Sequence, residues 1–377
     1  MMDDLQQAGA LLAAERRAAL LAILHTEGSL RIADLTNRLG VTAMTLRRDL
    51  AQLEAKGLAT RVHGGAIRSS GSMTDTPRAA LAASAARGNE EGELPKIGIL
   101  VPGVEFYWPE VIDGLQARAR ADGFQVVLRV SSYQAADERV TLDRLAETDG
   151  LVGLILATAA DPRRDPRLTE WLEDCELPTV LMEREAFGSP ASRVWETAVS
   201  DHALGARMAV EHLAELGHRR VGLALSKESP TARKVVAGWQ AATKELGLSR
   251  EEHFERLVPN VQHPDFHEQA DDIVTTAVER GVTGLLVHSD PEAFAVVQYA
   301  QERGLAVPGD LSVMSYDDVA AYKYTPALTA VRPAREAVGF AALGILTRRI
   351  ADPDRPVHRI IVSPVLNIRE STGPAPK

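Results

Sequence analysis

The chain has 377 residues, a formal net charge of −10 and a single cysteine, Cys175. This length suffices for two or three domains, and one cysteine excludes an internal disulfide framework and a cysteine-based metal cluster. No apolar run predicts a membrane-spanning helix, and the acidic start Met1-Met2-Asp3-Asp4 lacks the basic residues of a secretory signal. We therefore expect a cytoplasmic protein that does not contact membranes.

Charge is unevenly distributed along the chain. Residues 16–68 contain nine Lys or Arg against four Asp or Glu, a net charge of +5 that leaves −15 on the remainder. A basic head on an acidic body is typical of a DNA-binding protein with a separate sensor.

Three helices are predicted near the N-terminus. Apolar stripes at helical spacing indicate a first helix around Leu20 and a second over residues 31–39 that buries Leu35. Gly40 ends the second helix, and Thr42 is a good N-cap for the third.

The third predicted helix, residues 42–53, has the character of a DNA-recognition helix. Leu46, Leu50 and Leu53 lie at i, i+4 and i+7 and face the core. The other face presents side chains near the N-terminal turn, which is the part of a recognition helix that meets base edges and phosphates. The residues expected to face DNA are Thr42, Met44, Thr45, Arg47 and Arg48.

The Gly64-Gly65 pair between extended residues predicts the tip of a small β-wing. Arg61 and His63 would lie against the DNA backbone there. The alternative is an ordinary three-helix bundle whose arginines are solvated, and the helical pattern alone does not decide between the two.

Residues 32–66 closely resemble the winged helix-turn-helix of the DeoR family. The two most distinctive stretches are Arg47-Arg48-Asp49-Leu50 and His63-Gly64-Gly65-Ala66. The resemblance implies that Thr42, Thr45, Arg47 and Arg48 face DNA and that the wing flanks the groove. Residues 69–94, rich in Ser, Gly, Ala and Glu, predict a linker, in which residues 78–87 form at most a short helix.

From Lys96 onward, short apolar runs alternate with amphipathic stretches, the signature of βαβ units and parallel sheets. Gly217 and Gly304 stand where a helix end favours a left-handed residue. A pattern of this length predicts two doubly wound lobes. Strands are expected over 97–101, 125–130, 153–156, 179–182, 221–225, 284–287 and 311–315, and helices over 109–122, 201–216, 230–246 and 291–303.

Aromatic and polar residues follow several predicted strands, at the ends where parallel sheets bind ligands. Phe106, Tyr107 and Trp108 cluster in a chain that is only 5% aromatic; aromatic faces stack on sugar rings, and charged groups hold sugar hydroxyls. The polar candidates after later strands are Glu183, Arg184, Ser226, His288, Ser289, Asp290, Tyr316, Asp317 and Asp318. Each has an alternative structural role, as a core aromatic, a helix cap or a structural histidine.

Residues 96–377 resemble the effector domain of the LacI/GalR family. That resemblance implies a two-lobed, periplasmic-binding-protein-like domain that dimerises and closes on an effector between its lobes. We expect the chain to pass between the lobes near residue 200 and again near 318–332. The motifs that carry the resemblance include 96–102, 150–155, 178–181, Ala209 to Val221, Ala237-Gly238-Trp239, 307–313, Tyr316-Asp317-Asp318 and 326–329.

Matching positions imply an effector site drawn from both lobes. Asp317 would hold sugar hydroxyls, Phe266 would be the stacking aromatic, and the remaining contacts would come from Ser289, Asp290, Arg184 and the Phe106–Trp108 loop. Two positions depart from the family: Val235 replaces a frequent arginine, and Ser289 replaces a frequent asparagine. Either Arg184 or Arg233 substitutes for that arginine, or the effector lacks the group that it recognises.

The fold class expected is therefore a two-lobed periplasmic-binding-protein-like α/β sensor behind a winged helix-turn-helix. Its parts are a DNA-binding domain over 1–68, a linker over 69–94 and an effector-binding and dimerisation domain over 95–377. We expect a transcription regulator, a homodimer on operator DNA, that represses carbohydrate-utilisation genes until a sugar-like effector relieves it. No cofactor, metal or catalytic residue is expected.

Two other functions remain open. An enzyme acting on a sugar or sugar phosphate would need a motif such as a Walker loop, a nucleophile elbow or a zincin sequence, and none is present. His263 and His267 predict an exposed loop rather than a metal site. A sugar-binding protein without operator-specific DNA binding is the second alternative, against which the basic head argues.

Overall fold

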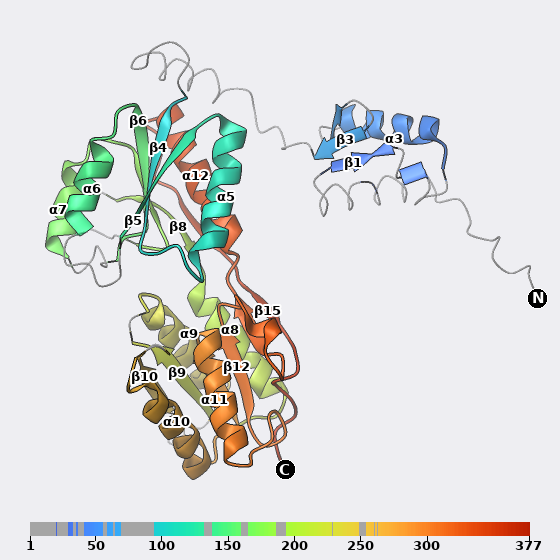
Figure 1. Ribbon diagram of the computed structural model, residues 1–377, viewed down its shortest axis with the longest axis vertical. Helices are drawn as coiled ribbons and strands as arrows, with labels where there is room; N and C mark the ends of the chain where they lie inside the picture. The colour runs from blue at the N-terminus through green and yellow to red at the C-terminus, as the bar shows by residue number, and fades with distance from the viewer. Residues whose placement is uncertain are drawn as a thin grey trace, which may run out of the picture. The chain divides into compact units, whose positions relative to one another are not determined.

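The computed structural model describes residues 20, 29–32, 35–36, 41–55, 59–62, 65–68, 94–131, 138–159, 165–185, 194–227, 229–248, 254–259, 261 and 263–377. The chain divides into two compact units, Met1–Ala79 and Ala80–Lys377 (Figure 1). The predicted first helix apart from Leu20, most of the second, the linker segment 78–87 and His63 lie outside the described residues.

The N-terminal unit combines a helix with a small antiparallel sheet. Helix α3 spans Ala43–Ala55, and strands β1 (Ser29–Arg31), β2 (Ala59–Val62) and β3 (Gly65–Arg68) pair in the order β1-β3-β2. Among the described residues of this unit, the buried apolar side chains are Leu20, Leu35, Leu46 and Leu50. The predicted third helix and wing are therefore present, whereas β1 was not predicted, because three residues carry no periodicity and their pairing partner lies far along the chain.

The second unit contains two lobes, each built on one sheet. Lobe 1 has a fully parallel sheet with the strand order β14-β8-β7-β6-β4-β5. Its first elements are β4 (Lys96–Val101), α5 (Trp108–Asp122), β5 (Gln125–Val130), α6 (Glu138–Ala146), β6 (Leu151–Leu156), α7 (Pro166–Asp174), β7 (Thr179–Met182) and β8 (Glu196–Ser200). All five apolar residues of β4 are buried, as both faces of a parallel sheet require.

Lobe 2 repeats this architecture with the strand order β10-β9-β11-β12-β13-β15, in which only β15 runs antiparallel to its neighbour. Its elements up to β13 are α8 (His202–Glu215), β9 (Val221–Ser226), α9 (Ala232–Glu245), β10 (Phe254–Val258), α10 (Phe266–Arg280), β11 (Gly284–His288), α11 (Asp290–Glu302), β12 (Ser312–Tyr316), the 3-10 turn η1 (Ala321–Lys323) and β13 (Thr329–Arg332). Helices α8 and α9 lie side by side, as do α10 and α11.

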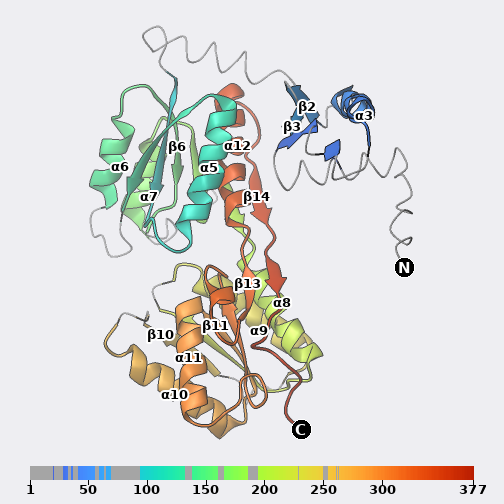
Figure 2. The ribbon, with the colours of Figure 1, turned by 45° about the vertical axis from the view of Figure 1, so that its right-hand side comes forward.

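The chain passes between the lobes three times. It leaves lobe 1 after β8, returns after β13 to form α12 (Arg335–Ala351) and β14 (Arg359–Val362), and crosses once more to form β15 (Val365–Asn367). Two passages were expected from the sequence, and the third was not, because β14 and β15 are short strands separated by only two residues. All three passages connect the same pair of lobe ends (Figure 2).

Local sequence signals account for many element boundaries. Asp201 caps α8 by accepting a hydrogen bond from the backbone N–H of Leu204 at 2.9 Å, and Gly217 and Gly304 have φ of 93° and 79°, which confirms the predicted helix ends. All seven predicted strands are present within two residues of their observed bounds. Strands β8, β10, β13, β14 and β15 were missed because they are short and lack a sustained apolar run.

Helix α12 completes the core of lobe 1 by packing closely against α5. A Cβ atom built on Gly339 would lie 2.0 Å from the backbone oxygen of Val111, and one on Gly114 would lie 2.0 Å from that of Glu336. Two helix backbones can approach this closely only where both lack side chains at the crossing. The late helix α12 is thus fixed against the first helix of the lobe.

Substitution of Gly339 tests this crossing. Gly339→Ala should destabilise the protein by about 2 kcal/mol, because the new methyl group meets backbone rather than a movable side chain. Thermal unfolding followed by circular dichroism measures the change. The matched control is Gly344→Ala on the same helix, where the nearest atom is the guanidinium of Arg118 at 3.1 Å, and no loss of stability is expected. Equal stability of both variants with the native protein would contradict the tight crossing.

Candidate functional site

The N-terminal turn of α3 exposes a polar face. Thr42 accepts a hydrogen bond on Oγ1 from the backbone N–H of Thr45 at 3.3 Å, as an N-cap residue does. Met44 is 79% exposed, and Thr42 and Arg48 are exposed as well, whereas Leu46 is fully buried on the opposite side. The helix therefore presents Thr42, Met44 and Arg48 outward from the turn where a recognition helix reads DNA.

The other predicted DNA-contacting residues are only partly described. Thr45 is half-buried, and its hydroxyl lies 3.0 Å from that of Thr42. Arg47 lies in α3 and Arg61 in β2, but the structure does not describe the side chains of these two residues. His63 lies outside the described residues.

In lobe 1, three residues from the ends of neighbouring strands form a hydrogen-bonded cluster. Tyr107, before α5, donates its hydroxyl hydrogen bond to Glu183, which follows β7. Ser200, the last residue of β8, donates to the same carboxylate through both its hydroxyl and its backbone N–H, at 2.7 and 3.1 Å. Because parallel strands end on one edge of a sheet, residues far apart in sequence meet here.

The Glu183 carboxylate is buried and ionised. Burial raises its pKa, but hydrogen bonds and charge from His202, together with those of Ser200 and Tyr107, outweigh burial and lower the pKa to about 2. The imidazole Nε2 of His202 lies 3.5 Å from Glu183 Oε2. Since His202 begins α8 in lobe 2, this contact joins the two lobes.

In lobe 2, a second carboxylate and histidine meet at the ends of β11 and β12. His288 Nε2 lies 3.3 Å from Asp317 Oδ2. Burial lowers the pKa of His288, but the charge and hydrogen bond of Asp317 outweigh it, so the pKa is raised. Burial raises the pKa of Asp317, but His288 and more distant cations outweigh it, so this pKa is lowered. The two groups therefore favour the ionised pair.

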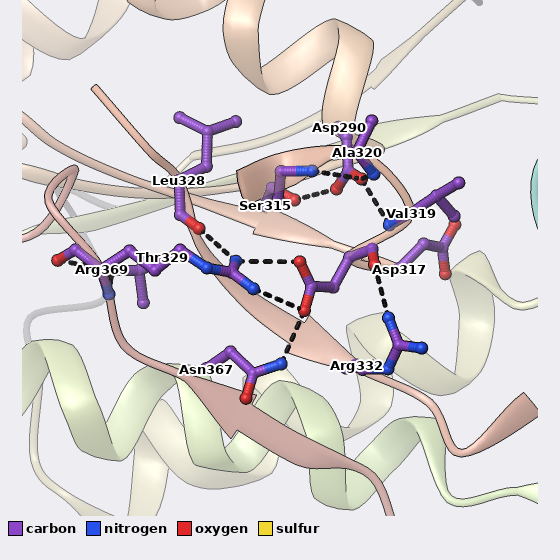
Figure 3. Close-up of polar contacts among 12 residues, drawn as sticks. Asp290, Ser315, Asp317, Val319, Ala320, Leu328, Thr329, Arg332, Asn367 and Arg369 are labelled. Atoms are coloured by element: carbon purple, nitrogen blue, oxygen red, sulfur yellow. Dashed lines mark hydrogen bonds and ion pairs between the residues drawn. The ribbon is translucent and has the colours of Figure 1, made fainter. Parts of the chain in front are cut away.

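The loop after β12 is held by Asp290 (Figure 3). Its carboxylate accepts hydrogen bonds from the backbone N–H groups of Val319, Ala320 and Ala321 at 2.6, 2.7 and 3.1 Å, and from the hydroxyl of Ser315. Asp290 is 1% exposed. It was predicted to contact the effector, but the structure commits both of its oxygens to holding this loop.

Asp318 holds the same loop to the C-terminal segment. Its carboxylate accepts from Arg369 Nη2 at 2.9 Å and from the side-chain amide of Asn367 at 2.6 Å. Arg332 Nη1 donates to the Asp318 carbonyl oxygen at 2.9 Å. Figure 3 shows these groups converging beside Asp317. Asp317 and Asp318 both have positive φ, 92° and 51°, and these contacts fix that conformation.

Two arginines near the second passage tie this loop to lobe 1. Arg332 and Arg335 each donate to one carboxylate oxygen of Glu110 on α5, both at 2.8 Å. Arg335, which is 1% exposed, also donates to the Asp317 carbonyl oxygen. Burial raises the pKa of Glu110, but the two guanidinium groups outweigh burial and lower it. Glu110 is therefore an ionised anchor for both arginines.

The aromatic residues and the serine predicted to contact the effector differ in their exposure to solvent and in their contacts. Phe106 is 58% exposed with φ of 50°. Trp108 and Phe266, by contrast, are buried in the cores of lobes 1 and 2, so their ring faces are unavailable in this conformation. The Ser289 hydroxyl donates to Glu292 in a capping box at the start of α11.

The basic residues near the sequence departure at Val235 also have defined positions. Val235 is buried in the core of lobe 2, and Arg233 is exposed. Arg184 is 5% exposed and donates to the carbonyl oxygens of Thr158 and Glu183 at 2.6 and 2.8 Å. Lys234 lies 2.9 Å from Glu185, so a cation next to Val235 contacts lobe 1.

The structure thus brings together Tyr107, Asp317 and Glu183 with three residues that the sequence analysis missed. These are His202, Arg335 and Glu110. Their signal in the sequence is weak: His202 follows a strand that was not predicted, and the ion pairs of Glu110 join residues more than two hundred positions apart. Among the described residues, no group of His, Cys, Asp and Glu has the arrangement of a metal site, and no helix is long and apolar enough to cross a membrane.

Comparison with protein families identifies two regions of the chain. Residues 16–71 match a DeoR-like helix-turn-helix domain, and residues 210–372 match a periplasmic binding protein-like domain. These matches confirm the predicted combination of a helix-turn-helix head with a two-lobed sensor fold.

Relatives and solved structures agree with this assignment. A helix-turn-helix transcriptional regulator from the aml 5′ region of Streptomyces limosus is 37% identical over 268 residues, which cover 67% of this chain and 71% of that protein. The transcriptional repressor PurR of Pectobacterium carotovorum is 30% identical, with 77% and 84% covered. A LacI-family regulator of Enterococcus faecium, solved with bound ribose, has the same fold, with a TM-score of 0.60 and 20% identity over 74% of this chain and 99% of that one.

Removal of the Asp290 carboxylate tests its role in the loop after β12. Asp290→Ala leaves three backbone N–H groups and one hydroxyl without their acceptor, so the protein should lose about 3 kcal/mol of stability. Asp290→Asn retains one carbonyl acceptor of the same size and should lose less. Chemical denaturation of the two variants measures both effects. A native-like stability of the alanine variant would show that the loop does not depend on this side chain.

Proposed function

The chain belongs to the LacI family of transcription regulators, and on that premise we propose that it is a homodimeric repressor whose operator affinity is controlled by a carbohydrate bound between its two lobes. The observation that carries this proposal is the presence, in one chain, of a matched helix-turn-helix region over residues 16–71 and a matched periplasmic binding protein-like region over 210–372. The first region supplies DNA contacts and the second supplies the sensor.

The DNA-binding surface is the N-terminal turn of α3 with the β2–β3 wing. Thr42, Met44 and Arg48 are exposed on this turn. We assign Thr45, Arg47, Arg61 and His63 to the same surface from their positions in the sequence. Two copies of α3 in a homodimer would enter successive major grooves of an imperfect palindrome. Residues 1–68 form this domain, and 69–94 link it to the sensor over 95–377.

The effector contacts come from the strand ends described above. Asp317 has the strongest support, because its carboxylate is only partly buried, with 16% of the side chain exposed, and its backbone is fixed by Arg335. A carboxylate held in this way accepts hydrogen bonds from sugar hydroxyls. We also place Phe106, Tyr107, Arg184 and Ser289 at the effector, whereas Trp108, Phe266 and Asp290 act through the cores and the loop that they hold.

The name of one relative supports the sign of control that we propose. One of them is named a repressor, and we propose that this chain represses carbohydrate-utilisation genes in the cytoplasm until the effector binds. Closure of the lobes would change the spacing of the two heads. The effector can weaken operator binding only by its differential affinity for the two states, typically about 1 to 3 kcal/mol.

Binding is also favoured over catalysis by the state of the buried carboxylates. Glu183 and Asp290 each accept three or more hydrogen bonds, and Asp318 is paired with Arg369. Groups committed in this way hold elements in place and are poorly suited to transfer protons. We therefore propose that the chain is not an enzyme.

Fluorescence anisotropy on DNA from the region upstream of the gene tests the DNA-binding part. Arg48→Ala should weaken binding at least tenfold, because one cation near the groove is lost. The slope of the logarithm of affinity against the logarithm of salt concentration should become shallower by about one unit, the contribution of one phosphate contact. Arg120→Ala is the matched control, since Arg120 is exposed on α5 of the sensor, and its affinity should be native. Equal affinity of both variants would remove α3 from the DNA interface.

Asp317→Asn tests the effector part. Loss of the carboxylate charge should weaken binding of the recognised sugar by about 1.5 to 3 kcal/mol, since hydrogen bonds to charged groups contribute this much. Operator affinity without sugar should stay within twofold of native. The measurement is calorimetric titration with D-ribose, maltose and cellobiose, followed by anisotropy with the sugar that binds. A variant that keeps its full sugar response would exclude Asp317 from the site.

A further inference from the structure

We propose that His288 is a positioning residue for Asp317, and that its imidazole takes up a proton as the two lobes close on a bound carbohydrate. This inference rests on the proposed effector function and adds a dependence on pH to it. His288 is the last residue of β11, one position before the loop that leads into α11. Its Nε2 lies 3.3 Å from Asp317 Oδ2, and its buried Nδ1 has no hydrogen-bond partner among the described residues.

The orientation of the Asp317 carboxylate depends on this contact. The Asp317 backbone is fixed, because its N–H donates to Val331 at 2.9 Å and its carbonyl oxygen accepts from Arg335. The side chain can still rotate about its own bonds. His288 Nε2, at 3.3 Å from Oδ2, holds one carboxylate oxygen and thereby sets the direction of the other. A ligand hydroxyl would meet an oxygen that is already oriented.

Charges from several elements surround the imidazole of His288. Asp317 comes from the end of β12, and Asp290 and Glu292 come from α11; all three favour the protonated imidazole, whereas burial opposes it. The basic side chains that lower the pKa of Asp317 are His288, His202 on α8 and Arg335 on α12. The balance leaves the pKa of His288 raised above that of an ordinary imidazole, so these charges favour its protonated form.

A chain of buried polar groups connects this pair to lobe 1. The ring of Tyr316 lies next to His288 and to His202, with centroid separations of 5.7 and 5.9 Å. Its hydroxyl lies 3.1 Å from His202 Nδ1, and His202 Nε2 lies 3.5 Å from Glu183 Oε2 in lobe 1.

The close approach of Tyr316 depends on Gly205, where a Cβ atom would lie 2.5 Å from the tyrosine hydroxyl. Tyr316 can therefore reach the start of α8 only because position 205 has no side chain. The imidazole of His288 thus lies two side chains away from a group of the other lobe.

The physical reason for proton uptake is the cost of burying charge. A ligand that covers Asp317 removes the remaining water from its carboxylate, and an uncompensated buried charge is strongly unfavourable. A protonated His288 offsets that cost, so the closed, liganded form holds the proton more tightly than the open form. By linkage, sugar affinity must then fall as the pH rises through the pKa of His288.

The test is calorimetric titration of the full-length protein with D-ribose, maltose and cellobiose between pH 6 and pH 8.5. We expect the dissociation constant of the sugar that binds to rise roughly three- to tenfold over this range and by no more than tenfold per pH unit, because one proton is linked. His288→Gln keeps an N–H donor but cannot take up the proton, so the dissociation constant of this variant should not change with pH. His267→Gln is the matched control, because His267 lies exposed on α10, and its profile should follow the native protein.

Two results would overturn the proposal. The first is a native pH profile in His288→Gln. The second is a loss of sugar affinity in His288→Gln by the same factor at every pH, so that the dependence of affinity on pH stays native. That result would indicate that His288 has only a structural role. Circular dichroism of the variant first establishes that it folds.

Histidine NMR separates this inference from the effector function. In the ligand-free native protein, labelled at histidine Cε1, the His288 resonance should titrate at a higher pH than an ordinary imidazole, and Asp317→Asn should lower that pH. If no sugar of the panel binds, the proposed effector class fails while this titration still tests the pair. A His288 resonance that does not respond to Asp317→Asn would overturn the positioning role.

Discussion

Charge compensation at the passages between the two lobes is the constraint on which the sensor depends. Glu183, Asp317 and Arg335 are each buried or nearly so, and each is an ion. An ion in such a place is tolerated only beside an opposite charge and with its hydrogen bonds satisfied. The partner of Glu183, His202, comes from the other lobe, and Arg335 reaches the Asp317 carbonyl oxygen from beyond the second passage, whereas the partner of Asp317, His288, lies in the same lobe. Any relative movement of the lobes must therefore preserve or exchange these pairs.

The elements of the fold were predictable from the sequence to different degrees. Continuous apolar runs predicted seven of the parallel strands, and Thr42 and Asp201 carried the cap signals of α3 and α8. Strands β8 and β13 to β15 could not be predicted, because their existence depends on pairing with distant strands rather than on local periodicity. The edge strand β15 becomes a strand only through its antiparallel register with β13.

The residues of the candidate site also divide into those with a local sequence signal and those whose role depends on distant contacts. Position after a strand identified Glu183 and Asp317 as candidate site residues. It did not distinguish them from Asp290, whose carboxylate binds backbone N–H groups, or from Phe266, which is fully buried. Those differences depend on where each side chain points once both sheets have formed. Contacts such as Arg335 with Glu110 have no local signal, since helix α12 returns to lobe 1 only after the chain has formed lobe 2 as far as β13.

The three passages of the chain also affect its biosynthesis. Lobe 1 lacks α12, with its core residues Val338 and Leu343, until translation has passed the end of lobe 2's β13. Lobe 2 in turn lacks β15 and the contact of Ser371 with Val313 until the last segment has been made. Both lobes therefore stay incomplete until almost the whole chain has been made. Premature termination before Val365 would leave the lobe-2 sheet without its edge strand, and the truncated chain would be a substrate for chaperones and proteases rather than a half-active sensor.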